Sequence, residues 1–334
     1  MRAASITQLL IAATLVLWGG GAAAQTYGVG VTSNTPNLGR VASAASGNTV
    51  FRVNPSSGLV TRVSGSGARI DTGATRATVT ISCGSTNACN TDNVNVRIGA
   101  SGTGGRGRAL TNFTVAMGTA SLVTAPSGTN PINFRIGPIG KNSSKTFYVG
   151  ADFPIAGNDS GSASGAAFSA FYVWADDAPN TPTGNQADTG EAVATVFRPL
   201  AISKISDLSF GRIVKPVSGT GGVVGLAAAN SGRSFPPGVT WLNLPAPGRA
   251  TYTVTGEGGQ MLSINIPPSF TMVGPSGSSL TVTTDDTAPT SPVLSAVSGT
   301  GGSYTFYVGG SFPITPTTRN GGYTGTFNVT VSYN

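Results

Sequence analysis

Hydrophobic and polar residues alternate with a period of two along much of the chain. Residues 78–83, 94–98 and 262–266 each place apolar side chains on one face and polar ones on the other. Such runs, rich in Val, Thr, Ile, Tyr and Phe, are separated by Gly, Pro, Asn and Ser, which is typical of antiparallel sheets. Glu occurs at only two positions, so good helix formers are scarce. The pattern predicts an all-β protein in which each sheet buries one face.

An internal repeat divides the chain. Residues 145–174 and 304–333 align without a gap at an offset of 159, with nine identities that include Phe168 and Phe327. Upstream, residues 38–41 match residues 210–213, and residues 76–81 match residues 249–254, in the same order. Repeats at this long spacing predict duplication of a whole domain, because solenoids and propellers repeat at much shorter periods.

The first residues have the features of a secretory signal. Arg2 precedes an apolar run over residues 9–18, and Ala22, Ala23 and Ala24 supply the small residues that a signal peptidase needs. The run is too short to span a bilayer as a helix. We therefore expect a signal peptide over residues 1–24 and export of the mature chain. Its domains are predicted at residues 25–175 and 192–334, joined by an acidic linker at residues 176–191.

The mature chain is basic, and most of the excess lies in its first half. Residues 25–175 carry eleven Arg and Lys against four Asp. One interpretation is attraction of an anionic glycan or lipid headgroup to loops such as the one with Arg106 and Arg108. The other is that scattered charges keep a weakly charged sandwich soluble. Nucleic acid is not expected, because the Arg residues are not interleaved with aromatic residues and the chain is exported.

Cys83 and Cys89 are the only cysteines of the chain. In an oxidising compartment we expect them to form a disulfide that closes a small loop, worth about 2 to 3 kcal/mol. Metal binding is the competing interpretation, but without His or a second Cys pair the number of ligands is too small. No metal or cofactor is therefore predicted.

Catalysis is not predicted either. The chain has no His, which removes the commonest general base and the usual nucleophile triad. The four Asp residues of the first half lie in polar contexts typical of turns or strand edges. We therefore expect a non-enzymatic protein.

The C-terminal residues form a strand pattern with apolar side chains at alternate positions, namely Phe327, Val329, Val331 and Tyr333. Only Asn334 follows them. This strand either pairs within its own domain or leaves a sheet edge that another polypeptide completes.

The start of the mature chain shows the same alternation at Tyr27, Val29 and Val31. The segment is either the first strand of its own sandwich or a donor segment that inserts into another subunit.

Residues 321–334, with a penultimate Tyr, resemble the C-terminal strand of chaperone-usher pilins, most closely the archaic type with spore-coat-protein-U domains. In the first half, residues 78–83 and 107–110 follow an order similar to that family. In the second half, residues 208–213 and the closing Tyr-Asn are more similar to a pilin-like domain of bacterial surface proteins whose function is unknown.

This resemblance implies tandem sandwiches of immunoglobulin-like topology, a topology that in this family lacks one strand. It implies a periplasmic chaperone and an usher as partners, and neighbouring pilus subunits whose strands replace the chaperone. The residues that would border the acceptor groove are Phe327, Val329, Val331 and Tyr333. The expected location is the periplasm in transit, then the cell surface.

Two functions follow as hypotheses. The first is a structural or tip-adhesin subunit of a surface pilus, whose first domain would contact a host or abiotic surface or an anionic glycan. The alternative is a stand-alone secreted protein that binds carbohydrates or surfaces through basic loops.

Overall fold

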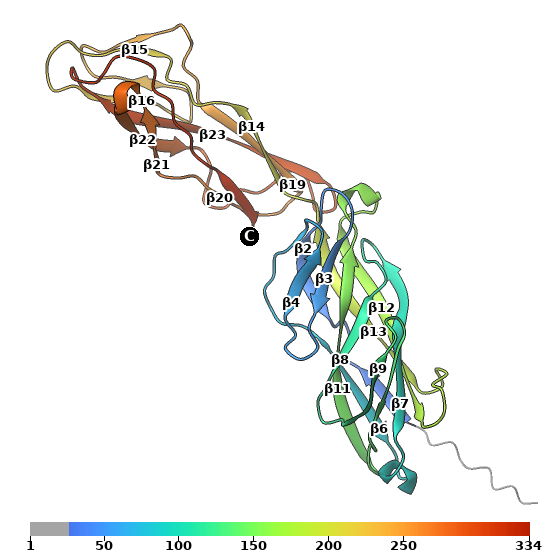
Figure 1. Cartoon of the computed structure of the whole chain (residues 1–334). Coiled ribbons are helices and arrows are strands. Elements are labelled where there is room, and N and C mark those ends of the chain that lie inside the picture. The colour runs from blue at the N-terminus through green and yellow to red at the C-terminus, as the bar shows by residue number, and fades with distance from the viewer. Residues whose placement is uncertain (1–26) are drawn as a thin grey trace, which may run out of the picture.

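A computed structural model describes residues 27–334 of the chain, so the expected signal peptide lies outside the described residues. The fold is all-β, as predicted, and its helical parts are short 3-10 turns at Asn87–Asn90, Asn158–Ser160 and Pro275–Gly277. Two elongated units follow one another end to end (Figure 1). Among the described residues, no helix has the length and apolar character needed to cross a membrane.

The first unit contains thirteen strands. They are β1 (Tyr27–Val31), β2 (Asn37–Ala42), β3 (Thr49–Val53), β4 (Val60–Ser64), β5 (Ala68–Arg69), β6 (Ala77–Cys83), β7 (Val94–Gly104), β8 (Thr111–Met117), β9 (Leu122–Ser127), β10 (Ile132–Ile136), β11 (Ser143–Ile155), β12 (Gly165–Asp177) and β13 (Ala187–Phe197).

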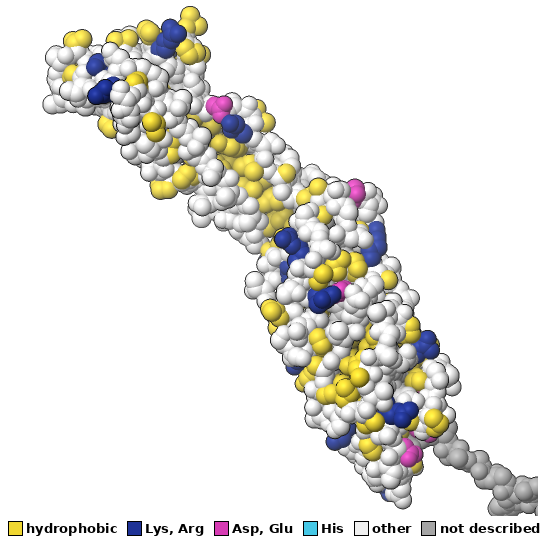
Figure 2. Space-filling view, in the orientation of Figure 1, with side chains coloured by type: hydrophobic (Ala, Val, Ile, Leu, Met, Phe, Trp, Pro, Cys, Tyr) yellow, Lys and Arg dark blue, Asp and Glu magenta, His cyan; other side chains and the backbone are white. Residues whose placement is uncertain are grey.

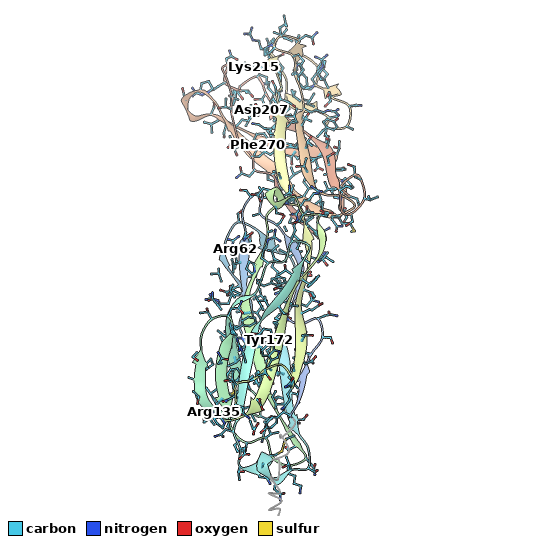
Figure 3. The ribbon with its side chains drawn as sticks, turned by 90° about the vertical axis from the view of Figure 1, so that its right-hand side faces the viewer. Arg62, Arg135, Tyr172, Asp207, Lys215 and Phe270 are labelled. Atoms are coloured by element: carbon cyan, nitrogen blue, oxygen red, sulfur yellow. A yellow bond between two sulfur atoms is a disulfide. The ribbon has the colours of Figure 1, made fainter. Side chains whose placement is uncertain are left out.

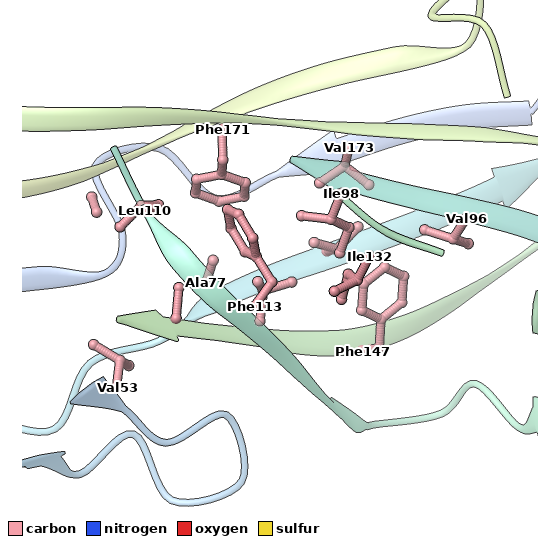
Figure 4. Packing of buried hydrophobic residues seen from close by; sticks show 14 of the residues in the cluster. Val53, Ala77, Val96, Ile98, Leu110, Phe113, Ile132, Phe147, Phe171 and Val173 are labelled. Carbon is pink, nitrogen blue, oxygen red and sulfur yellow. The ribbon is translucent and has the colours of Figure 1, made fainter. Parts of the chain in front are cut away.

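These strands form two sheets. One has the order β1-β6-β11-β3-β4, with β8 also pairing with β11, and the other has the order β5-β2-β13-β12-β7-β10-β9. Alternate side chains of both sheets meet in one continuous core. Figure 4 shows Phe113 of one sheet beside Phe171 of the other, with ring centroids 6.2 Å apart. Burial of these alternating apolar side chains is what holds the two layers together.

The acidic segment 176–191 is not a linker, and this prediction was wrong. β12 and β13 pair along their length, so the segment contains a hairpin that belongs to the first unit. One of its acidic side chains binds within this unit: the Asp188 carboxylate accepts a hydrogen bond from Val31 N–H at 2.7 Å. The sequence pattern did not reveal β13, because its inward positions before Val196 are occupied by Gly and Ala, which give no strong hydrophobic alternation. The chain passes from one unit to the other after Phe197.

The second unit contains eleven strands. They are β14 (Ala201–Ser206), β15 (Arg212–Val214), β16 (Gly222–Leu226), β17 (Arg233–Ser234), β18 (Thr240–Leu242), β19 (Ala250–Glu257), β20 (Leu262–Asn265), β21 (Ser269–Val273), β22 (Ser279–Asp286), β23 (Gly301–Ile314) and β24 (Thr330–Tyr333). One sheet has the order β14-β19-β23-β16-β17, with β22 pairing with β23 and β21 with β22; β15–β18 and β20–β24 form two separate pairs.

The repeat seen in the sequence has the same structural role in both units. Arg76 lies over the ring of Tyr148 at 3.5 Å, and Arg249 lies over the ring of Tyr307 at 3.4 Å. In each unit the arginine immediately precedes a strand, β6 in the first unit and β19 in the second. That strand pairs with the long strand that carries the tyrosine, which is β11 in the first unit and β23 in the second. The duplication therefore includes the strand register as well as the sequence.

The sequence alignment of the two repeats no longer matches equivalent structural positions after the long strands β11 and β23. Phe168 faces outward and is 37% exposed, whereas its sequence match Phe327 packs against the core of the second unit. Since neighbouring strand residues face opposite sides, the two segments differ by an odd number of residues in register. The identity of the two Phe residues in the gapless alignment is therefore not a structural equivalence.

Candidate functional site

Among the described residues, strand β13 of the first unit has no counterpart in the second. β13 lies between β12, to which it is antiparallel, and β2, to which it is parallel. Ala192, Ala194 and Val196 of β13 are buried, while Glu191 and Thr195 are exposed. β13 therefore supplies part of the core and also provides the backbone hydrogen bonds for the facing edges of its two neighbours.

In the second unit, the position that β13 occupies in the first unit is empty among the described residues, although a strand lies on each side of it. β15 pairs only with β18, and β24 pairs only with β20, among the residues that the structure describes. β24 corresponds to β12, since residues 304–333 match residues 145–174 in sequence. β15 corresponds to β2 by sequence and by a left-handed glycine: Gly39, within β2, has a φ of 69°, and Gly211, just before β15, has a φ of 65°. The layer that is continuous in the first unit is thus divided in the second at the place of β13.

Two cavities lie along this gap. One, of about 270 Å³, adjoins the end of β14, and the other, of about 670 Å³, adjoins β15. They share part of their lining, including Leu208, Phe210, Met272 and Tyr323, so they form one groove. We call it the open-strand groove; residues 204–215 line one side of it and residues 318–327 the other. In Figure 2, hydrophobic side chains gather on the part of the second unit next to the first.

The floor of the open-strand groove is aromatic. Phe327 lies 5.0 Å from Phe270 and 6.4 Å from Tyr252, measured between ring centroids. Farther along, Phe210 meets Phe312 edge-on at 4.9 Å. A strand laid over these rings would remove apolar surface from water at about 25 cal/mol per Å². The groove therefore suits an extended segment with apolar side chains at alternate positions.

The predicted apolar ridge does face the core of the second unit, and its members are Phe327, Val329, Val331 and Tyr333. Phe327 lines the groove. Val331 and Tyr333 belong to β24 and lie opposite Ile264 and Leu262 of β20. One edge of β24 is therefore paired within its own unit. Completion of the other edge by a second polypeptide stays a prediction.

Tyr333 anchors the end of β24 at the junction of the units. Its hydroxyl donates a hydrogen bond to the Arg198 carbonyl oxygen at 2.9 Å and accepts one from Glu257 N–H at 2.7 Å. Burial raises the pKa of the Tyr333 hydroxyl. The Arg40 guanidinium donates to the Asn334 carbonyl oxygen. Figure 1 accordingly shows the C-terminus beside the first unit. This end of the groove is held in place by the chain itself.

The segment predicted as a possible donor, with Tyr27, Val29 and Val31, is strand β1 of its own unit. It pairs antiparallel with β6 along its length, and the Tyr27 side chain is only 2% exposed. Val29 and Val31 pack against the first core. The donor hypothesis is therefore wrong for these residues, because their edge and their apolar face are already used, and the alternative of a first strand is correct.

The predicted ligand loop also needs correction. Arg106 is 1% exposed, and its guanidinium donates to the Ser43 hydroxyl at 2.7 Å, the Asn158 side-chain oxygen at 2.9 Å and the Ser162 carbonyl at 3.0 Å. Burial lowers the pKa of Arg106. Arg108 is half-buried and donates to the Gly107 carbonyl at 3.0 Å. Arg106 thus joins loops of the first unit and is not placed to meet a ligand.

The expected disulfide is present. Cys83, at the end of β6, is joined to Cys89 in the following 3-10 turn. Both side chains are buried at the edge of the first core. The bond closes the short loop predicted from the sequence and lies in the first unit, away from the groove.

The rim formed by residues 208–213 was missed as part of the site. Sequence reasoning identified only the C-terminal side of the groove, because the strand pattern there is long and regular. A usable signal existed in the match between residues 38–41 and 210–213. The former become β2, which flanks β13, and the latter begin β15, which flanks the gap.

Among the comparisons with known proteins, a family model matches the second unit, whereas the similar solved structures cover most of the chain. Residues 200–333 match a family described as a domain of unknown function, DUF4402. No curated protein matches the chain. A solved complex of the chaperone CsuC with the tip adhesion subunit CsuE, from archaic chaperone-usher Csu pili of Acinetobacter baumannii, is similar over 91% of this chain and 99% of that one, with 10% identity and a TM-score of 0.25. A chaperone–tip adhesin complex of CFA/I fimbriae is similar over 91% of this chain and 97% of that one, with 10% identity and a TM-score of 0.22. The function of this chain therefore has to be inferred from its own geometry.

Proposed function

We propose that this protein is a non-enzymatic subunit of a bacterial surface pilus, and that a strand from another polypeptide completes its second unit. The observation that carries the proposal is the open strand position between β15 and β24, which β13 fills in the first unit. The resemblance of residues 321–334 to the C-terminal strand of chaperone-usher pilins supports the same function.

An exported protein is not expected to leave such an edge uncovered. Unpaired strand edges invite uncontrolled association, and here the edge adjoins an aromatic floor. A periplasmic chaperone that lends a strand would cover the groove during transit to the usher, and a neighbouring pilus subunit would occupy it afterwards. β-strand addition of this kind combines main-chain hydrogen bonds with pockets for alternate side chains.

A position at the tip of the fibre is part of the proposal. The second unit has an acceptor groove, whereas β1 and β13 of the first unit are both paired within their own sheets. In this proposal the second unit accepts a strand, and neither β1 nor β13 is available as a donor. The first unit, in which β13 already fills the equivalent strand position, would be the part that meets a surface. The stand-alone alternative loses Arg106 from its suggested loop, because that side chain is buried, and keeps only the half-buried Arg108.

The test fills the groove from within the same chain. A Gly/Ser linker as long as the loop 178–186 is added after Asn334, followed by a copy of β13 in which Gly190, Ala192 and Ala194 are each replaced by Val. This hairpin repeats the connection between β12 and β13. The control carries the same added residues with apolar and polar positions grouped in blocks, which cannot present one apolar face.

We expect the added strand to raise the melting temperature of the second unit by about 5 °C or more, because a short linker supplies the strand at millimolar effective concentration. Trp241 fluorescence in a Trp174→Phe background reports this unit. In the producing bacterium, the unmodified chain should appear in surface fibres and the strand-filled chain should remain a monomer. Equal incorporation of both chains into fibres would refute the proposal.

A further inference from the structure

The charges along the open-strand groove are distributed unevenly. Near β14, Lys204 and Asp207 form an ion pair at 2.5 Å. The larger cavity, next to β15, is lined by three cations and by no Asp or Glu; the cations are Arg212, Lys215 and Arg319. Figure 3 shows Phe270, Asp207 and Lys215 in this order with increasing distance from the first unit. The end of the groove far from the junction is therefore positive.

The first unit shows how the equivalent arginine is neutralised. Arg40, the sequence match of Arg212, binds Asp71 through its Nη2 at 2.8 Å and through its Nε at 3.0 Å. Among the described residues, Arg212 has no ion pair. Lys215 donates a hydrogen bond to the Thr318 carbonyl at 2.7 Å and has no ion pair within residues 27–334. The second unit thus keeps the arginine and lacks the carboxylate.

The missing strand would pass directly beside this arginine. In the first unit, Thr195 of β13 lies opposite Arg40 of β2, and its side chain is exposed. A strand that occupies the groove as β13 does would place one outward-facing side chain next to Arg212. It would also cover the neighbouring cations in part, which makes an uncompensated positive charge more costly.

We propose that the strand that fills the groove comes from a different protein and carries a carboxylate side chain beside Arg212, close to Lys215 and Arg319. This inference rests on the proposed function and identifies the chemistry of the partner. If the strand runs as β13 does, the carboxylate lies toward its C-terminal end. The apolar floor alone would accept a strand in several registers and in either direction. The cations at the far end of the groove would select the register and direction that bring the carboxylate to Arg212.

A second copy of this chain does not fit as the source. The N-terminal residues 1–70 contain neither Asp nor Glu, and the first acidic residue is Asp71. The segment Tyr27–Val31 is already paired in its own sheet. An N-terminal strand from another copy would therefore bring no carboxylate to Arg212, which favours a heterologous partner.

The experiment uses the strand-filled chain and varies the added copy of Thr195 to Glu, Gln or Lys. We expect the Glu version to melt about 2–4 °C above the Gln version, and the Lys version to melt below it. The difference between Glu and Gln should shrink in 1 M NaCl, where charges are screened within about 3 Å. Arg212→Gln should abolish it. Arg233→Gln, a cation of the same unit outside the groove lining, should leave it intact.

The outcomes separate this inference from the proposed function. If every added strand stabilises the second unit by the same amount, the groove accepts strands and the carboxylate inference is wrong. If none of them stabilises it, the proposed function itself fails. If inorganic phosphate raises the melting temperature of the unmodified chain as much as the Glu strand does, the cations form a small-anion site. Self-association of the unmodified chain that depends on Arg212 would make a second copy the partner. Either of the last two results overturns the inference.

Discussion

Replacing Tyr333 by Phe tests whether β24, which forms one edge of the open-strand groove, is fixed in position in the absence of a bound strand. The Tyr333 hydroxyl makes two hydrogen bonds, to the Arg198 carbonyl at 2.9 Å and from Glu257 N–H at 2.7 Å. Its ring, which the substitution keeps, lies 5.5 Å from that of Phe197. The change therefore removes only the polar contacts that tie β24 to the junction.

The expected cost follows from these two contacts. A hydrogen bond contributes about 0.5–1.5 kcal/mol net, and a buried donor left without a partner costs about 1–3 kcal/mol. Glu257 is fully buried, so its N–H cannot easily find water instead. Because the two contributions overlap, we expect Tyr333→Phe to lower the free energy of unfolding of the second unit by about 2 kcal/mol.

Urea unfolding, followed by Trp241 fluorescence in a Trp174→Phe background without residues 1–24, measures this unit separately. Tyr304→Phe is the matched control, since Tyr304 is a half-buried tyrosine of the same unit in the same core. Its hydroxyl makes no hydrogen bond within the described residues, so we expect a change below about 0.5 kcal/mol. A loss for Tyr333→Phe as small as for the control would show that β24 is not anchored by this hydroxyl.

Two further predictions concern the first unit. Arg106→Ala should lower its free energy of unfolding by about 3 kcal/mol, since one buried and two partly buried hydrogen bonds of a buried side chain are lost. Arg108→Ala should cost less than about 1 kcal/mol, and equal losses in urea unfolding would contradict the structural role of Arg106. Hydrogen bonds from Arg40 hold the pKa of Asp71 below its ordinary value of 3.8, so the ionised form stabilises the fold above that pH, and this contribution is lost as the pH falls through the lower folded value. Asp71→Asn should accordingly be less stable than the unmodified chain at pH 6, with the difference shrinking as the pH falls below 3.8 and through the lower folded pKa; a difference that does not shrink in acid would argue against the ion pair.

The sequence by itself determined the fold class, the duplication and the disulfide. A period of two in apolar side chains is a local property of strands, and the offset of 159 is visible without knowing which strands pair. The apolar face of the C-terminal strand could be identified for the same reason. Arg106 and the segment 176–191 were misjudged, because a residue type does not reveal burial, and Gly and Ala at the inward positions of β13 give no hydrophobic signal.

Only the tertiary structure decided where a strand is missing. The gap lies between β15 and β24, two strands that are more than a hundred positions apart in the sequence, and no local pattern contains that information. It became visible when β13 was found between β2 and β12 in the first unit. The same holds for the positive end of the groove, since Arg212 and Arg319 are distant in sequence and line one cavity only because the sandwich brings their loops together.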